Sequence, residues 1–196
     1  MSPYAPTAMR ACLLPPPHPA FDVLVPGAAP VVLDDGPDVV LVAGDPAAAP
    51  VEVLADVTAA VERGAVLVCL GVPEGEGWAA ITGVRPGEVV PGGEVFATVA
   101  ARTPATARIT GEFPVAGTFR WLEPVADVAT LLTSSIRFAH RPALVQRRLG
   151  EGRVVTCGFG ADAVVHGSSG NGELVRVLRR LVDGAAAADR ADLGVG

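Results

Sequence analysis

Cysteine, histidine and carboxylate side chains are the residues of this sequence that could carry chemistry, and several of them follow apolar runs. Cys69 lies near the end of the run Ala65–Leu70 and is followed closely by Gly71. A strand that ends in a cysteine and a tight turn can expose a thiolate nucleophile. His166 is the candidate base for that thiol, so Cys69 and His166 form the catalytic pair that the sequence offers.

A buried structural cysteine is the alternative for Cys69, because free cysteine is among the most buried residue types. Three cysteines at wide spacing, without a CxxC pair, predict neither a disulfide framework nor a zinc site. Leu67 stands where a nucleophile elbow has glycine, and Val72–Gly77 resembles a loop more than a helix start. No acidic residue stands two positions after His166 to orient it.

Other polar and aromatic side chains follow the predicted strand ends and are the candidate ligand-binding residues: His18, Glu74, Glu76, Trp78 and Asp162. The carboxyl ends of parallel strands share one edge of a sheet, and ligands bind there. We therefore expect the main pocket to be lined by at least two of the three loops that carry these residues, Pro15–Pro19, Gly71–Trp78 and Gly158–Asp162.

Each of these candidates has a structural alternative. Trp78 could stack on a sugar face or simply close the core, and Glu74 and Glu76 could be a solvated loop pair. His18 and His166 could converge with Asp162 as a metal or acid/base set. Their spacing has no ligand signature, so the sequence predicts no metal site and no cofactor.

The elements that must position these residues are those of an α/β fold. Asp38–Ala43 and Ala65–Leu70 are predicted as buried parallel strands on either side of a helix from about Pro50 to Arg63. Ala143–Leu149 and Arg153–Cys157 are predicted as a hairpin. Together they indicate a three-layer domain with a mostly parallel sheet and a small antiparallel β extension.

The remaining segments complete this prediction. Further strands are expected at Met9–Leu14, Phe21–Val25, Val31–Leu33, Glu94–Ala100, Arg108–Thr110, Phe119–Leu122 and Val125–Thr133. A last helix is expected at Gly172–Val182, where the apolar residues fall on one stripe. Residues 1–196 are expected to form a single domain, with flexible tails at 1–7 and 185–196.

Composition excludes several classes of function. The net charge is −6, and the 15 basic residues, all arginine, are scattered, which argues against a nucleic-acid partner. The absence of lysine excludes a Schiff-base lysine and a Walker-type phosphate lysine. No apolar run approaches the length of a membrane helix, and there is no secretory leader, so we expect a cytoplasmic protein with no membrane partner.

The order of several segments resembles the trehalose-utilisation (ThuA-like) family, a branch of the class I glutamine-amidotransferase-like superfamily. The matching pieces between Met9 and Val182 are the DVVLVAGD strand and turn, AVLVCLG, ITGV, RTPATARITGEFPV and PALVQRRLGEGRVVTCGFGAD. The resemblance implies a flavodoxin-like fold. The family's His-Pro is Thr103-Pro104 here, and its Gly-His reads Gly160-Ala161, which implies that the family's catalysis is reduced or lost.

Three functions follow from these observations. The first is a ThuA-like domain that binds a sugar-like small molecule in carbohydrate metabolism. The second is a non-catalytic interaction module, either a homo-oligomer or a subunit of a larger complex, which would use the apolar, Gly- and Pro-rich surface of residues 84–125. The third is an amidotransferase-like hydrolase that depends on a reactive Cys69.

Overall fold

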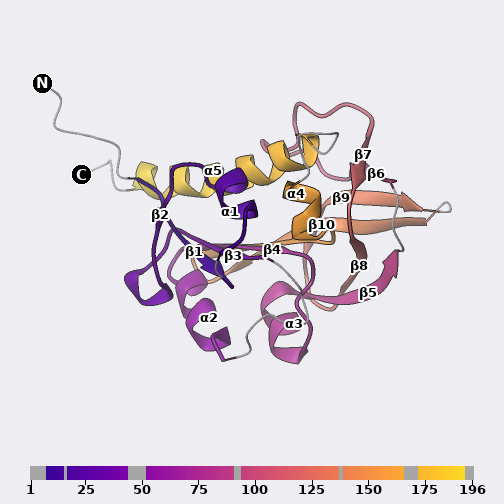
Figure 1. Cartoon of the computed structure of the whole chain (residues 1–196). Coiled ribbons are helices and arrows are strands. Elements are labelled where there is room, and N and C mark those ends of the chain that lie inside the picture. The colour runs from indigo at the N-terminus through magenta and orange to yellow at the C-terminus, as the bar shows by residue number, and fades with distance from the viewer. Residues whose placement is uncertain are drawn as a thin grey trace, which may run out of the picture.

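The computed structural model describes residues 8–15, 17–43, 52–90, 94–136, 139–165 and 172–192. These residues form a mixed α/β fold in which a large sheet lies between two layers of helices (Figure 1). In the described part of the chain the sheet has nine strands, in the order β2-β1-β3-β4-β11-β10-β9-β6-β7.

The first half of the sheet is parallel. It contains β1 (Arg10–Leu14), β2 (Ala29–Pro30), β3 (Val39–Val42), β4 (Val66–Leu70) and β11 (Gly152–Cys157). β3 and β4 are buried at every position, as is typical of parallel strands covered on both faces. The predicted β-α-β unit between Asp38 and Leu70 is confirmed, because β3 and β4 pair in parallel.

The second half of the sheet is antiparallel and larger than the small extension predicted. It contains β10 (Ala139–Leu149), β9 (Ala129–Ile136), β6 (Glu94–Val99) and β7 (Glu112–Ala116). The predicted hairpin is confirmed: β10 and β11 pair from Leu144 opposite Cys157 to Leu149 opposite Gly152. A separate two-stranded sheet joins β5 (Val84–Val90) to β8 (Phe119–Pro124).

The helices divide between the two faces of the main sheet, which gives the three layers that were predicted (Figure 1). On one face lie α1 (Ala20–Leu24), α4 (Ala161–Val165) and α5 (Gly172–Asp192). On the other face lie α2 (Leu54–Glu62) and α3 (Glu76–Thr82), beside the short 3-10 helix η1 (Leu33–Asp35). Burial of both faces of β4 between these layers supplies the main stabilising hydrophobic contacts.

Some local predictions were wrong. The segment Phe21–Val25 is not a strand, because residues 20–24 form α1, which buries Ala20 and Leu24 one helical turn apart. Arg108–Thr110 is not a strand either: the Arg102 guanidinium donates hydrogen bonds to the carbonyls of Ala107 and Ile109 and holds this stretch as a loop.

Other elements differ from the prediction in their limits. β9 begins at Ala129, so the first four residues of the predicted strand Val125–Thr133 precede it. α5 continues to Asp192, ten residues past the predicted end at Val182. The expected helix start near Pro50 lies outside the described residues, and α2 itself begins at Leu54. No described helix is long and apolar enough to cross a membrane.

Candidate functional site

The carboxyl ends of β4 and β11, where a ligand crevice was expected, are covered by the first residues of β8. The Gly71 amide donates to the carbonyls of Cys157 and Phe159, at 3.0 and 2.9 Å. The Arg120 amide donates to the Gly158 carbonyl at 2.9 Å, and Phe119 forms an isolated antiparallel bridge with Phe159. The Phe119 and Phe159 rings are fully buried, so aromatic side chains occupy this strand end.

Gly158 allows this close approach. A Cβ atom at position 158 would lie 2.3 Å from the carbonyl oxygen of Arg120, well inside van der Waals contact. Gly158, in the sequence motif Gly158-Phe159-Gly160, therefore allows the main chain after β11 to lie against the main chain of β8.

Cys69 lies inside the core and not on an exposed turn. Its side chain is fully buried on the α2 and α3 face of the sheet, packed among apolar residues that include Leu67 and Val154. Burial raises the pKa of the Cys69 thiol far above its usual range, because the apolar surroundings disfavour the thiolate. This environment is that of an inert structural cysteine and is the opposite of the electropositive surroundings that activate a nucleophile.

Trp78 also belongs to the core. It lies in α3, only 1% of its surface is exposed, and it packs in the same apolar cluster as Cys69. α3 was not expected, because the sequence Val72–Gly77 resembles a loop; the helix begins at Glu76, after Gly75 with a φ of +109°. Of the two alternatives for Trp78, the structure shows the one in which it closes the core.

Glu74 and Asp162, which were expected at one edge of the sheet, both contact the segment 118–120 at the start of β8. The Arg120 guanidinium forms an ion pair with Glu74 at 2.7 Å. Two residues earlier, the main-chain amide and the hydroxyl of Thr118 donate to Asp162 Oδ2 at 2.7 and 3.0 Å. The carboxylates therefore flank a short polar surface made by residues 118–120 and their partners.

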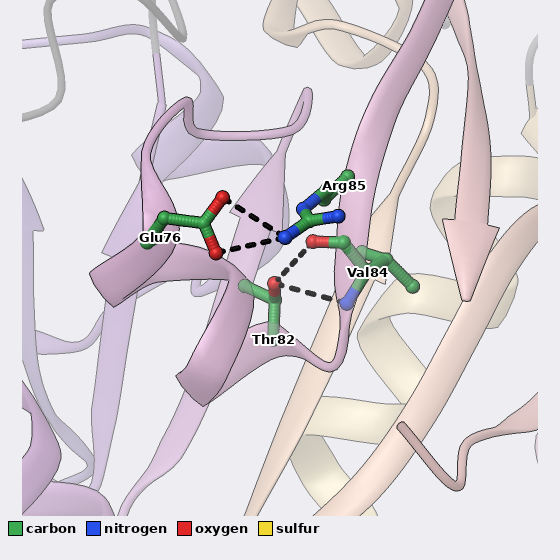
Figure 2. A network of polar contacts seen from close by, with 4 residues as sticks. All are labelled: Glu76, Thr82, Val84 and Arg85. Atoms are coloured by element: carbon green, nitrogen blue, oxygen red, sulfur yellow. Dashed lines mark hydrogen bonds and ion pairs between the residues drawn. The ribbon is translucent and has the colours of Figure 1, made fainter. Parts of the chain in front are cut away.

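Glu76 has a different partner, Arg85. Both of its carboxylate oxygens lie 2.9 Å from Nη2 of Arg85, on β5, as Figure 2 shows. The Thr82 hydroxyl donates to the Trp78 carbonyl at 2.8 Å and also lies 3.1 Å from the Val84 carbonyl. Figure 2 shows its contacts with the carbonyl and the amide of Val84, which fasten the end of α3 to the start of β5. Glu76 thus helps to hold two elements together at the protein surface.

His18 lies in a different region. Its Nδ1 accepts a hydrogen bond from the Ala20 amide at 3.1 Å, at the start of α1. It lines an open groove of about 910 Å³ beside β1, together with residues of β1, α1, β2, η1 and α2. Of the three loops expected to line the main pocket, Pro15–Pro19 contributes described residues to this groove; a pocket at which two of the loops meet stays a prediction.

His166 lies outside the described residues, so its position relative to Cys69 stays a prediction. Within the described ranges no group of three or more His, Cys, Asp or Glu side chains has a geometry that could hold a metal ion. Thr118 and Arg120 were not among the predicted site residues, because their partners lie more than 40 positions away in the sequence. The acidic residues of the groove were not predicted either. The run Leu33-Asp34-Asp35 was the available signal for the latter.

No protein-family model matches the chain, and no curated protein is similar to it in sequence. Its fold, however, is found in solved structures. A ThuA-like protein from Bacteroides uniformis superposes with a TM-score of 0.58 and 15% identity, over 92% of this chain and 94% of that one. At this identity the likeness concerns the fold, and it is consistent with the expected flavodoxin-like fold.

Longer glycosidases contain the same fold. A β-galactosidase from Rahnella sp. R3 matches with a TM-score of 0.63 and 12% identity, over 90% of this chain and 31% of that one. An exo-β-1,4-mannosidase from an Opitutaceae bacterium matches with a TM-score of 0.62 and 12% identity, over 89% and 36%. The chain thus spans about a third of the length of these glycosidases, and at this identity the likeness concerns the fold alone.

Proposed function

We propose that this chain is a ThuA-like domain without catalysis of its own, which serves carbohydrate metabolism by binding. The burial of Cys69 is the observation that carries this proposal: a thiol with no exposed surface and a raised pKa has neither access to a substrate nor the charge of a nucleophile. The Phe119 and Phe159 rings, which fill the strand end beside it, support the same conclusion.

The proposed sugar-binding surface is the polar group of Glu74, Arg120, Thr118 and Asp162. Carboxylate oxygens accept and guanidinium groups donate hydrogen bonds, which suits the neighbouring hydroxyls of a sugar ring. Glu74 and Arg120 retain about 49% and 29% of their side-chain surface exposed, so a ligand can reach both. A ThuA-like protein, a β-galactosidase and an exo-β-1,4-mannosidase have similar folds, which supports a carbohydrate as the ligand.

Thermal-shift measurements against galactose, mannose, trehalose, keto-sugars and sugar phosphates test this function. A sugar that binds only the folded state raises the melting temperature, with a stabilisation of about 2.7 kcal/mol at 100 times its Kd. The Glu74→Gln variant should reduce that shift, whereas Glu88→Gln, a change to another exposed carboxylate, should leave it unchanged. A panel in which no sugar shifts the melting temperature contradicts the sugar-binding proposal.

The absence of catalysis is tested separately with nitrophenyl galactosides and mannosides and with glutamine as an amide donor. We expect no turnover above the rate in buffer. Turnover that disappears in a Cys69→Ala variant would support the third predicted function, a thiol-dependent hydrolase, and would overturn the proposal.

An association module is the second candidate, and two observations favour it. The same fold forms about a third of longer glycosidase chains, where it accompanies other parts of the protein. In addition, Val89, Phe96 and Val125 in the 84–125 region expose between 43% and 49% of their surface. Light scattering at micromolar concentration distinguishes the two candidates: a monomer that binds sugar supports the first, and a stable oligomer without sugar binding supports the second.

A further inference from the structure

The groove beside β1 has an apolar floor and an acidic rim. Leu13, Leu14, Phe21 and Val31 are among the apolar residues that line it. Its charged lining residues are four exposed aspartates, Asp22, Asp34, Asp35 and Asp56, and no arginine is among the lining residues. Its volume of about 910 Å³ lies at the upper end of the range that is typical for ligand sites.

The wall of this groove is an incompletely paired strand. The β1–β2 ladder ends where Ala11 faces Pro30, because β2 has only two residues. Every second residue of this stretch turns its main chain toward β2. The carbonyls of Met9 and Ala11 accept hydrogen bonds from the amides of Ala29 and Val31. Leu13 is the next residue whose main chain faces the β2 side. Among the described residues, its amide and carbonyl have no hydrogen-bond partner there.

We propose that this groove binds an extended peptide segment of a partner protein in which arginine or lysine alternates with apolar residues. The peptide continues the sheet where β2 stops: its main chain pairs with Leu13, and its apolar side chains cover the floor. Its basic side chains face Asp34, Asp35 and Asp56, on the η1 and α2 face of the sheet, whereas Asp22 lies in α1 on the other face.

The unpaired main chain favours a peptide over a small polyamine. Exposed donors and acceptors at a sheet edge are a template for another strand, and proteins commonly protect such edges. Among the described residues, the edge of β1 that faces β2 is open at Leu13, and Val32, in the segment that follows β2, exposes 63% of its surface. A polyamine would satisfy the aspartates but would leave both the Leu13 main chain and the apolar floor without partners.

The direct test is fluorescence anisotropy with a fluorescein-labelled seven-residue peptide in which valine and arginine alternate. We expect saturable binding to the full chain that weakens as NaCl is raised from about 50 to about 500 mM, since the rim carboxylates are exposed. The double variant Asp34→Asn/Asp35→Asn should weaken binding by about threefold to tenfold. The matched control Glu62→Gln/Glu151→Gln removes two exposed carboxylates outside the groove and should bind as the unchanged chain does.

Two further probes separate strand pairing from charge alone. A peptide of the same sequence with N-methylated alternate amides cannot pair with a strand, and it should bind at least about tenfold more weakly than the unmodified peptide. Spermine should compete poorly. Equal binding of the methylated peptide, an unchanged affinity of the Asp34/Asp35 variant, or full competition by spermine at the concentration of the peptide would each overturn the proposal. Sugar binding at Glu74 is independent of all three outcomes.

Discussion

The rings of Phe119 and Phe159 pack against each other with centroids 4.5 Å apart and an angle of 35° between their planes. Phe119 begins β8, and Phe159 follows the end of β11, so the pair joins the two-stranded sheet to the carboxyl edge of the main sheet. Both side chains are fully buried. At the end of β11, where α/β folds commonly bind ligands, two aromatic rings therefore belong to the hydrophobic core, and the exposed polar surface of Glu74 and Arg120 lies beside them.

The Phe119→Ala substitution is predicted to destabilise the protein by about 3–5 kcal/mol, the range for a buried phenylalanine, because it leaves a cavity beside Phe159. Urea denaturation followed by far-UV circular dichroism measures the change. Phe96→Ala is the matched control: its side chain is 43% exposed, and its loss should cost about 1 kcal/mol or less. Similar losses for both variants would show that the Phe119 ring is not a core contact.

The parallel half of the fold was predictable from the sequence because its signals are local. Val39–Val42 and Val66–Leu70 are uninterrupted apolar runs, and an amphipathic helix that ends at a glycine lies between them. The hairpin of β10 and β11 was predictable from its turn between Leu149 and Gly152.

The candidate site was much less predictable, because burial and pairing there depend on contacts between distant segments. A cysteine that precedes a glycine turn has the same local sequence whether it faces solvent or, like Cys69, the core. Likewise, Phe21 and Val23 favour a strand by their residue types, but Ala20 and Leu24 pack one helical turn apart on the sheet and the segment is helical. Tertiary packing decided both cases.

Cys69 is predicted to react with iodoacetamide at neutral pH only as fast as the protein unfolds, because its thiol is fully buried and its pKa is raised. Mass spectrometry of tryptic peptides after timed labelling measures the rate, and a urea-denatured sample gives the reference. If Cys69 in the native protein is labelled as fast as in the denatured one, the buried position is wrong.

Stability is predicted to fall as the pH rises above about 9. Burial raises the pKa of the Cys157 thiol from 9.0 to about 12, so the folded state keeps a proton that the unfolded chain releases. This contribution is fully present below the unfolded pKa and is lost between about pH 9 and 12, at about 1.4 kcal/mol per pH unit for each buried thiol.

The composition makes this effect measurable, because the chain has no lysine and only one tyrosine to titrate in the same range. Urea denaturation at pH 8, 9 and 10 gives the slope of stability against pH. The Cys157→Ala variant should have a shallower slope than the unchanged protein, whatever the change in packing does to its stability at pH 8. An equal slope in both proteins contradicts the assignment of the effect to Cys157.

Gly152→Ala is predicted to destabilise the protein by more than about 2 kcal/mol. A Cβ atom at this position would lie 2.1 Å from the carbonyl oxygen of Val61 and 2.3 Å from that of Ala65, so the end of α2 would have to move away from β11. The matched control is Gly184→Ala in α5, where nothing lies within 4 Å of an added Cβ. That change should stabilise the helix by up to about 1 kcal/mol. Thermal melts of both variants, compared with the unchanged protein, test the prediction.

Asp162→Ala is predicted to loosen the turn that precedes β8. Asp162 Oδ2 accepts hydrogen bonds from the amide and the hydroxyl of Thr118, and charge-assisted bonds of this kind contribute about 1.5–3 kcal/mol when protected from water. Because Thr118 is exposed, water replaces part of the loss, and we expect a cost of about 1 kcal/mol. The Thr118→Ala variant removes only the hydroxyl and should cost less.

Hydrogen exchange at the Thr118 amide should be faster in Asp162→Ala. It should be nearly unchanged in the matched variant Asp127→Ala, whose exposed carboxylate has no partner among the described residues. Unchanged exchange in Asp162→Ala would show that the carboxylate does not hold this turn.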